Sequence, residues 1–172
     1  DKERSLLRRT RIGFIFQFFN LLPTLTAGEN VALPLLLGRT GRSRARNLAE
    51  DALERVGILN RVDHFPEEMS GGEMQRVAVA RALVTEPEAI LCDEPTGNLD
   101  SANSKEILSL LRKLPEKGKR AVVMVTHDPQ AAAYGDRIIR IRDGLMESDC
   151  ETGADQDAQR MVLYQTPALE RT

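Results

Sequence analysis

Two patterns of hydrophobic and polar positions follow one another along the chain. Short apolar runs rich in β-branched or aromatic residues predict strands, at 11–16, 88–93 and 121–126. Longer amphipathic or capped stretches predict helices, at 26–37, 47–57, 69–84 and 101–114. The last of the three strands, AVVMVT, is almost continuously β-branched, so we expect it to be buried on both faces.

The first two helices are predicted with different starts. Thr26 is followed three residues later by Glu29, and this capping box predicts that a helix begins there. Residues 38–46 carry several like charges and two glycines, which is typical of a solvated loop. We therefore expect the second helix to begin only at residue 47.

The last third of the chain carries turn signals. Asp128 before Pro129 predicts a short helix. The Asp143-Gly144 pair lies between alternating segments and predicts a β-hairpin. The order strand, helices, strand, helix, strand, helix, strand predicts an α/β fold with a mostly parallel sheet.

The order of these elements divides the chain into parts. Residues 1–19 and 86–150 form the predicted core, and residues 20–85 form a helical lobe or subdomain. Residues 151–172 differ in composition from the rest. They are predicted to be either a loosely attached tail or a docking helix.

Composition narrows the classes of function. The 172 residues are 41% hydrophobic, with a formal net charge of −2. No basic surface is expected, which argues against nucleic acid as a partner. Two cysteines without metal-ligand spacing indicate a reducing compartment. The apolar run 31–37 is too short to span a bilayer and contains Pro34.

The stretch AILCDEPTGNLD at 89–100 carries the first candidate chemistry. Asp93 and Glu94 directly follow a predicted strand, and ligands gather at the carboxyl ends of strands in parallel sheets. Asp93 suits Mg²⁺ held partly by substrate phosphates. Glu94 is placed to polarise an attacking water. The structural alternative, in which both acids cap a helix or pair with arginines, stays equally open from this stretch alone.

The stretch SGGEMQR at 70–76 carries the second. Ser70 and Glu73 form a capping box, which is a sufficient structural explanation for those two residues. It does not explain Gly71 and Gly72, because each costs about 1 kcal/mol relative to Ala inside a helix. Glycines there leave the first N–H groups bare, which favours a phosphate site.

Two single residues complete the set. His127 follows the 121–126 strand, where it would share a sheet edge with Asp93 and Glu94; a lone histidine is more often structural. Gln17 follows the 11–16 strand and can contact a metal ion or its water. Taken alone, Gln17 carries little information.

Together, SGGEMQR, ILCDEP, GNLD, VTHD and FIFQ resemble the signature, Walker B, D-loop, switch histidine and Q-loop of the nucleotide-binding domain of ABC transporters, in the family's order over about residues 11–147. The resemblance implies a partial P-loop NTPase (RecA-like) core with an inserted helical subdomain. It also implies roles in handling ATP and Mg²⁺. By this resemblance, Glu94 and His127 are the catalytic residues, and Asp93 and Gln17 bind the metal ion. The residues implied in contacts with the nucleotide or across the dimer are Gln17, Ser70, Gly71, Gly72, Glu73 and Asp100.

A closer likeness, in GFIFQFFNLLPTLTAGENVALPLLL and DEPTGNLDS, is to the ATPases of lipoprotein-releasing, macrolide-export and cell-division systems. It implies ATP hydrolysis coupled to transmembrane permease subunits. It further implies a head-to-tail dimer with a second nucleotide-binding domain and a peripheral position on the cytoplasmic face of the membrane. A soluble ABC ATPase without membrane partners and a non-hydrolysing interaction module are the two rival readings.

One family motif does not occur. No G-x-x-x-x-G-K-[ST] phosphate loop is found in the 172 residues, and the family places this loop before the Q-loop. We therefore expect the chain to be the C-terminal part of a longer domain or the product of a shortened gene, with poor ATP affinity and negligible hydrolysis by itself.

Overall fold

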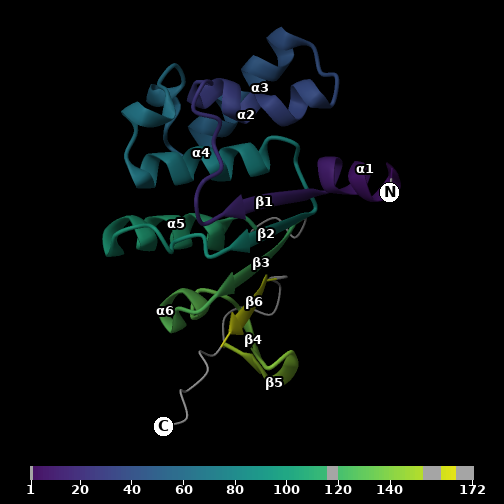
Figure 1. The fold of residues 1–172 in the computed structure, drawn as a ribbon, viewed down its shortest axis with the longest axis vertical. Coiled ribbons are helices and arrows are strands. Elements are labelled where there is room, and N and C mark those ends of the chain that lie inside the picture. Colours follow the sequence, from purple (N-terminus) through teal and green to yellow (C-terminus); the bar gives the residue numbers. More distant parts are fainter. Residues whose placement is uncertain (1, 116–119, 153–159, 166–172) are drawn as a thin grey trace.

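The fold is built on one mixed sheet. A computed structural model describes residues 2–115, 120–152 and 160–165. The strand order is β1-β2-β3-β6-β4-β5, and only β5, which pairs with β4, is antiparallel (Figure 1). The strands are β1 Ile12–Phe16, β2 Ala89–Asp93, β3 Ala121–Thr126, β4 Arg137–Arg142, β5 Leu145–Glu151 and β6 Arg160–Gln165.

Register aligns the carboxyl ends of the first three strands. Phe16 pairs with Asp93, and Asp93 pairs with Val125. The residues that directly follow these strands therefore leave the sheet at one edge, as expected for parallel strands.

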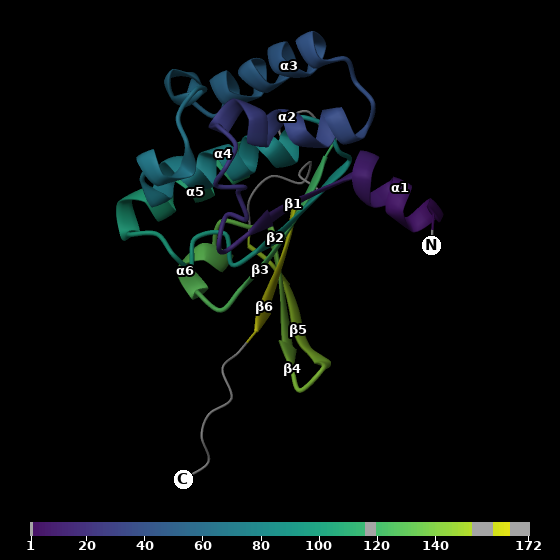
Figure 2. The ribbon, with the colours of Figure 1, turned by 45° about the horizontal axis from the view of Figure 1, so that its top comes forward.

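Helices gather mainly on the β1 side of the sheet (Figures 1 and 2). There α4 packs on β1, while α2 and α3 pack on α4 and on each other. The described helices are α1 Lys2–Thr10, α2 Ala27–Leu37, α3 Arg42–Arg55, α4 Gly71–Leu83, α5 Ser101–Lys113 and α6 Pro129–Ala132, with 3-10 turns at Leu59–Arg61 and Pro66–Glu68. None of the helices in these described residues is long and apolar enough to cross a membrane.

The core joins the sheet to these helices. Ile15 of β1, Ile90 of β2 and Val77 and Val79 of α4 are fully buried and belong to one cluster. In β3, Val122 and its alternate neighbours are buried, whereas the opposite face is half-buried. The prediction that this strand is buried on both faces is therefore only partly right, because the described residues cover its second face incompletely.

The start of α3 corrects one expectation. The helix begins at Arg42 rather than at residue 47, so the loop predicted at 38–46 is wrong from residue 42 onward. Ala45 and Ala49 are buried one helical turn apart, and this small apolar stripe extends the helix backward. The charges of this stretch then lie on the exposed side of a helix.

The prediction of a hairpin is confirmed, whereas the prediction for the C-terminal residues is wrong. Asp143 and Gly144 both adopt positive φ, +50° and +78°, and connect β4 to β5 as the predicted turn requires. Residues 160–165 form β6 between β3 and β4, where a loose tail or a docking helix was expected. The missed signal is the short run MVLY, rich in strand-forming residues.

The division of the chain into a core and a helical lobe stays a prediction.

Candidate functional site

The side chains of Glu94 and His127 meet at the carboxyl edge of the sheet. Glu94 Oε1 lies 2.7 Å from His127 Nδ1 and accepts a 2.8 Å hydrogen bond from the His127 backbone N–H. Glu94 Oε2 accepts a 3.1 Å bond from the Thr126 hydroxyl. The Glu94 side chain is 18% exposed and that of His127 is 69% exposed. A largely buried carboxylate is thus held in place by its neighbours while one edge stays open to water.

The backbone at Glu94 is strained. Its φ is +44°, a left-handed conformation that non-glycine residues seldom adopt and that tends to occur at functional sites. The Glu94 N–H donates to the Val125 carbonyl at 2.9 Å, and the Gly97 N–H donates to the Glu94 carbonyl at 3.0 Å. These bonds hold a tight turn directly after β2.

Asp93 ends β2 with an exposed side chain. In the part of the chain that the structure describes, the Asp93 carboxylate makes no hydrogen bond or ion pair, and neither Asp93 nor Glu94 pairs with an arginine or caps a helix. The structural alternative for this acidic pair is therefore not observed. Free carboxylate oxygens are ligands that Mg²⁺ prefers, so Asp93 fits such an ion, whereas the oxygens of Glu94 are already engaged.

Gln17 lies against the loop that follows Glu94. Asn98 Nδ2 donates to the Gln17 carbonyl at 3.0 Å, and Gln17 Nε2 lies 3.5 Å from Asn98 Oδ1. A Cβ at Gly97 would come within 2.7 Å of Gln17 Nε2, so the Gln17 side chain would have to move if this residue were not glycine. Sequence reasoning did not single out Asn98; the Gly-Asn pair within TGNLD was the available signal.

The start of α4 has a complete capping box. The Glu73 N–H donates to Ser70 Oγ at 3.3 Å, and the Ser70 N–H donates to Glu73 Oε2 at 2.7 Å. The pKa of Glu73 is lowered mainly by the Ser70 N–H, with a further contribution from Arg61, whose Nε lies 2.8 Å away. Within the described residues, the N–H groups of Gly71 and Gly72 have no acceptor.

Asp100 connects this helix start to α5. It is the N-cap of α5 and accepts from the N–H groups of Ala102 and Asn103, at 3.0 and 2.9 Å. These bonds, led by that of Asn103, lower the Asp100 pKa. The Asn103 side chain also donates to Asp100, at 2.6 Å, and its Oδ1 would lie 2.3 Å from a Cβ at Gly72. The predicted residues therefore fall into two groups, one around Glu94 and one around Gly72 and Asp100.

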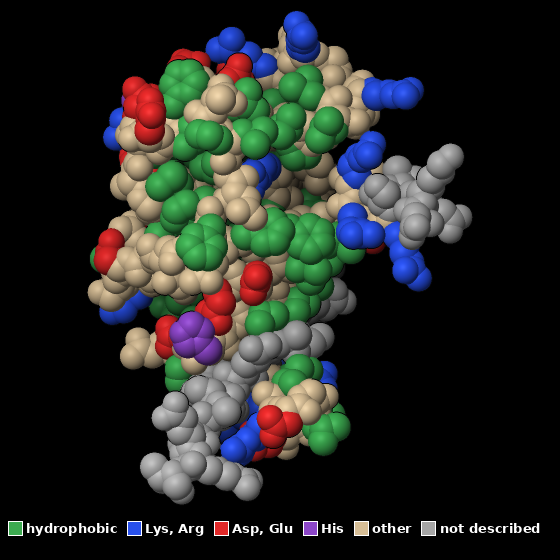
Figure 3. Space-filling view, in the orientation of Figure 1, with side chains coloured by type: hydrophobic (Ala, Val, Ile, Leu, Met, Phe, Trp, Pro, Cys, Tyr) green, Lys and Arg blue, Asp and Glu red, His purple; other side chains and the backbone are tan. Residues whose placement is uncertain are grey.

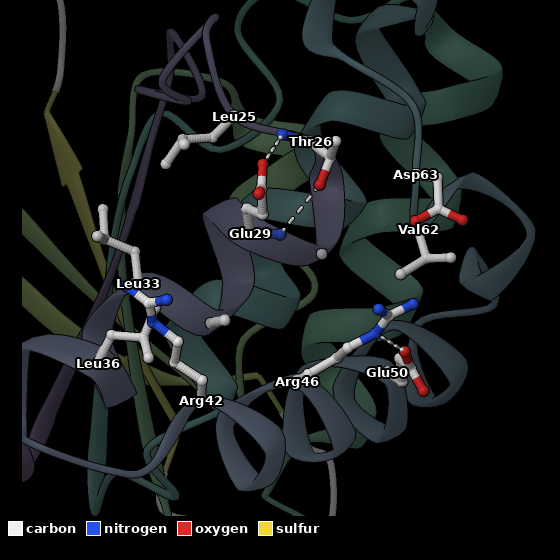
Figure 4. A pocket seen from close by; sticks show the side chains of 12 residues that line it. Leu25, Thr26, Glu29, Leu33, Leu36, Arg42, Arg46, Glu50, Val62 and Asp63 are labelled. Carbon is white, nitrogen blue, oxygen red and sulfur yellow. Dashed lines mark hydrogen bonds and ion pairs between the residues drawn. The ribbon is translucent and has the colours of Figure 1, made fainter.

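The surface adds context to these groups. On the face seen in Figure 3, acidic side chains lie beside a histidine, and basic side chains gather toward α1. A cavity of about 600 Å³ opens between α2 and α3, where Arg46 pairs with Glu50 (Figure 4). Its lining contains none of the predicted site residues.

A mostly parallel sheet with acidic and histidine side chains at its carboxyl edge lies beside a helix whose first two amides have no acceptor among the described residues. Such an arrangement is suited to an α/β domain that binds phosphates. The chain belongs to the ABC transporter family, because residues 1–97, more than half of it, match the family described as "ABC transporter".

Individual relatives agree with this assignment. The chain is 47% identical over 149 residues to the lipoprotein-releasing system ATP-binding protein LolD of Bordetella pertussis, covering 87% of this chain and 64% of the relative. It is 49% identical over 150 residues to the macrolide export ATP-binding/permease protein MacB of Rhodopirellula baltica, covering 86% of this chain and 22% of the relative. This chain thus spans less than two thirds of the length of either relative.

A solved structure shares the fold. It is a dimeric ATP-binding cassette in a post-hydrolysis state bound to ADP and Pi, 43% identical to this chain, with a TM-score of 0.78. The match covers 90% of this chain and 68% of that structure. The α/β fold with a mostly parallel sheet is therefore that of ABC ATPase cassettes.

Proposed function

We propose that this chain is part of the ATP-binding and ATP-hydrolysing subunit of an ABC transporter of the LolD and MacB type. The observation that carries the proposal is the contact between Glu94 and His127 at the strand ends of a family member, beside Asp93, which has no partner among the described residues. In this proposal the subunit couples ATP hydrolysis to the movement of transmembrane permease subunits.

Glu94 is the group that activates water. His127 and Thr126 use three acceptor positions of the Glu94 carboxylate, and Oε2 keeps capacity for one further hydrogen bond. A water held there would transfer its proton to Glu94 as its oxygen approaches phosphorus. His127, largely exposed, is left to contact the γ-phosphate of ATP.

Asp93 and Gln17 would hold Mg²⁺ together with the phosphates of ATP. The ion would supply charge neutralisation at the β- and γ-phosphates. The Asp93 carboxylate is exposed and has no partner in the described ranges, and Gln17 adjoins the loop that follows Glu94. The bond between Asn98 and Gln17 supports a positioning role for Asn98.

Ser70, Gly71 and Gly72 would contact the γ-phosphate of ATP bound by a second copy. The N–H groups of the two glycines have no acceptor in the part of the chain that the structure describes, and this supports the role because a helix N-terminus attracts anions. Glu73 completes the cap behind them. Asp100 would lie in the seam of a head-to-tail dimer, since it adjoins the α4 start through Asn103.

Membrane subunits are the second kind of partner. The names of the relatives LolD and MacB indicate release and export systems. We place the subunit on the cytoplasmic face of the membrane, with the helices α2 and α3 toward the permease. A permease pull-down tests this, and capture of ribosomes instead would favour the soluble rival.

Nucleotide affinity should be low in the 172-residue chain alone. No phosphate loop occurs in its sequence, and that loop provides much of the grip on the β- and γ-phosphates. Binding of isotope-labelled ATP at millimolar nucleotide measures this, and tight Mg²⁺-dependent binding would contradict it.

Hydrolysis is best tested in a fusion protein, in which the residues of the Bordetella pertussis LolD relative outside the matched segment are joined to this chain. The fusion protein should hydrolyse ATP with Mg²⁺. Glu94→Gln should lower kcat about 10²–10⁴-fold, because the amide cannot accept the proton of the water.

Glu67→Gln is the matched control. Glu67 is exposed in the 3-10 turn before α4 and lies outside the Glu94 cluster, so kcat should be unchanged. An active fusion protein that hydrolyses ATP equally well after Glu94→Gln would disprove the role given to Glu94.

A further inference from the structure

The buried side chain of Gln75 joins three segments of the site. Gln75 lies in α4 and is fully buried. Its Nε2 donates to the Pro95 carbonyl at 2.6 Å and lies 3.5 Å from the Phe16 carbonyl. Pro95 directly follows Glu94, and Phe16 directly precedes Gln17. One amide thus contacts both loops that carry the metal and water chemistry.

Only one of the two polar atoms of this buried amide is hydrogen-bonded within the described part of the chain. Gln75 Oε1 is buried and has no hydrogen-bond partner among the described residues. The other amide orientation would point Oε1 at the Pro95 carbonyl, so the bond to Pro95 fixes the assignment. An apolar side chain of similar length would fill the space without an unsatisfied oxygen. Packing therefore does not explain why an amide is present, whereas its donor function does.

That donor acts where the backbone is strained. Glu94 has positive φ, and strained backbone persists only when surrounding contacts hold it. The bonds of Glu94 to Val125 and Gly97 hold one side of the turn. Gln75 holds the other side at Pro95. The backbone that follows Glu94 is therefore tied to α4 through Gln75.

From these contacts we infer that Gln75 is a positioning residue that couples the two ATP sites of a dimer. The inference rests on the proposed function, in which the start of α4 contacts the ATP of the second copy while Glu94 acts on this copy's own ATP. Five residues after Ser70, Gln75 transmits a displacement of α4 to the backbone beside Glu94 and Gln17. Occupancy at one site then adjusts the catalytic group of the other.

The first test needs no nucleotide. In the 172-residue chain, Gln75→Met should raise hydrogen exchange at the Gly97 amide about 10-fold or more, because the turn at Glu94 loses one anchor. Gln130→Met is the matched control, since Gln130 is exposed in α6. The thermal midpoint should move by only a few degrees, as an unsatisfied acceptor is lost together with one bond. Gln75→Leu replaces Gln75→Met if the latter fails to fold.

The second test uses the fusion protein. Gln75→Met should lower kcat about 10- to 100-fold, as expected for a misplaced catalytic group, while KM for ATP changes less than threefold. The Hill coefficient for ATP should fall toward 1. Unchanged exchange at Gly97 overturns the positioning role, and altered exchange with unchanged kcat and Hill coefficient overturns the coupling. If the unsubstituted fusion protein is inactive, the proposed function fails separately, and exchange at Gly97 still decides the positioning role.

Discussion

The helices α2 and α4 begin with the same motif in different surroundings. Both are capped by a hydroxyl residue with a glutamate three positions later, and in both the N3 N–H donates to the capping hydroxyl at 3.3 Å. The reciprocal bonds to the glutamates are 2.9 Å in α2 and 2.7 Å in α4. Local sequence and local geometry are therefore nearly identical at these two helix starts.

Their first-turn amides differ. In α2, the N–H groups of Ala27 and Gly28 donate to the His64 and Val62 carbonyls, each at 2.8 Å. In α4, the corresponding amides have no acceptor within the described residues. A helix start can bind an anion only while its N–H groups are free. A capping box therefore marks a helix start, and the backbone packed against it decides whether a ligand can bind.

The largest effect on ATP hydrolysis is expected from placing a negative charge at the start of α4. A Cβ at Gly71 would make ordinary contacts, 3.4 Å from Leu99 and 3.7 Å from Phe19, so Gly71→Asp should fold. Its carboxylate would satisfy the bare amides and repel phosphate. We expect kcat/KM of the fusion protein to fall on the order of 10²–10³-fold, the size of effect seen when transition-state donors are lost.

Ser43→Asp provides the control for that experiment. Ser43 is exposed in the first turn of α3, where an acid also complements the helix dipole. The Ser43→Asp protein should hydrolyse ATP normally. Full activity in Gly71→Asp would show that α4 does not contact a phosphate.

A second pair of substitutions tests why glycine is present at residue 72 in α4 and at residue 28 in α2. A Cβ at Gly72 would lie 2.3 Å from Asn103 Oδ1, and one at Gly28 would lie 2.8 Å from Val62 Cγ2 and 3.1 Å from the Val62 carbonyl oxygen. Gly72→Ala and Gly28→Ala should each lower the free energy of unfolding of the 172-residue chain by about 1–3 kcal/mol. Gly28→Ala should lower it more, because a carbonyl cannot rotate away as a side chain can.

Double-mutant cycles measured by chemical denaturation check this explanation. Adding Asn103→Ala should recover most of the loss in Gly72→Ala. Adding Val62→Ala should recover only part of the loss in Gly28→Ala, since the clash with the carbonyl persists. Equal recovery in both cycles would contradict the assignment of the two clashes.

Much of the fold followed from sequence because its signals are local. Period, capping residues and the Asp143-Gly144 turn predicted most elements to within one or two residues. The start of α3 was missed because its apolar stripe consists of alanines, and β6 because its short apolar run lies within a polar tail. The start of α3 depends on burial of its alanines, and β6 depends on pairing with β3 and β4, which are distant in sequence.

The site divides in the same way. The positions of the acidic residues and of His127 directly after strands predicted that these side chains lie at one edge of the sheet. Glu94 and His127 are in contact there. Sequence could not predict that Thr126, Asn98 and Gln75 hold the surrounding groups, because each acts on backbone or side chains distant in sequence. It also could not separate the two capping boxes, since the carbonyls covering α2 come from another loop.

The smallest effect concerns the pH dependence of the α4 cap. The pKa of Glu73 is lowered from 4.5 first by the Ser70 N–H and then also by Arg61, whereas Glu29 has no ion pair in the described part of the chain. A lowered folded-state pKa stabilises the fold above the unfolded value, and this contribution is lost as pH falls through the folded value. The unfolding free energies of wild type and Glu73→Gln should therefore differ at pH 7 and converge below about pH 4. Arg61→Gln should remove only part of the difference, because the Ser70 N–H is the larger cause. Urea titrations from pH 3 to 7 measure the convergence, and an NMR titration of the Glu73 carboxyl at or above 4.5 would contradict the stabilising role of its cap.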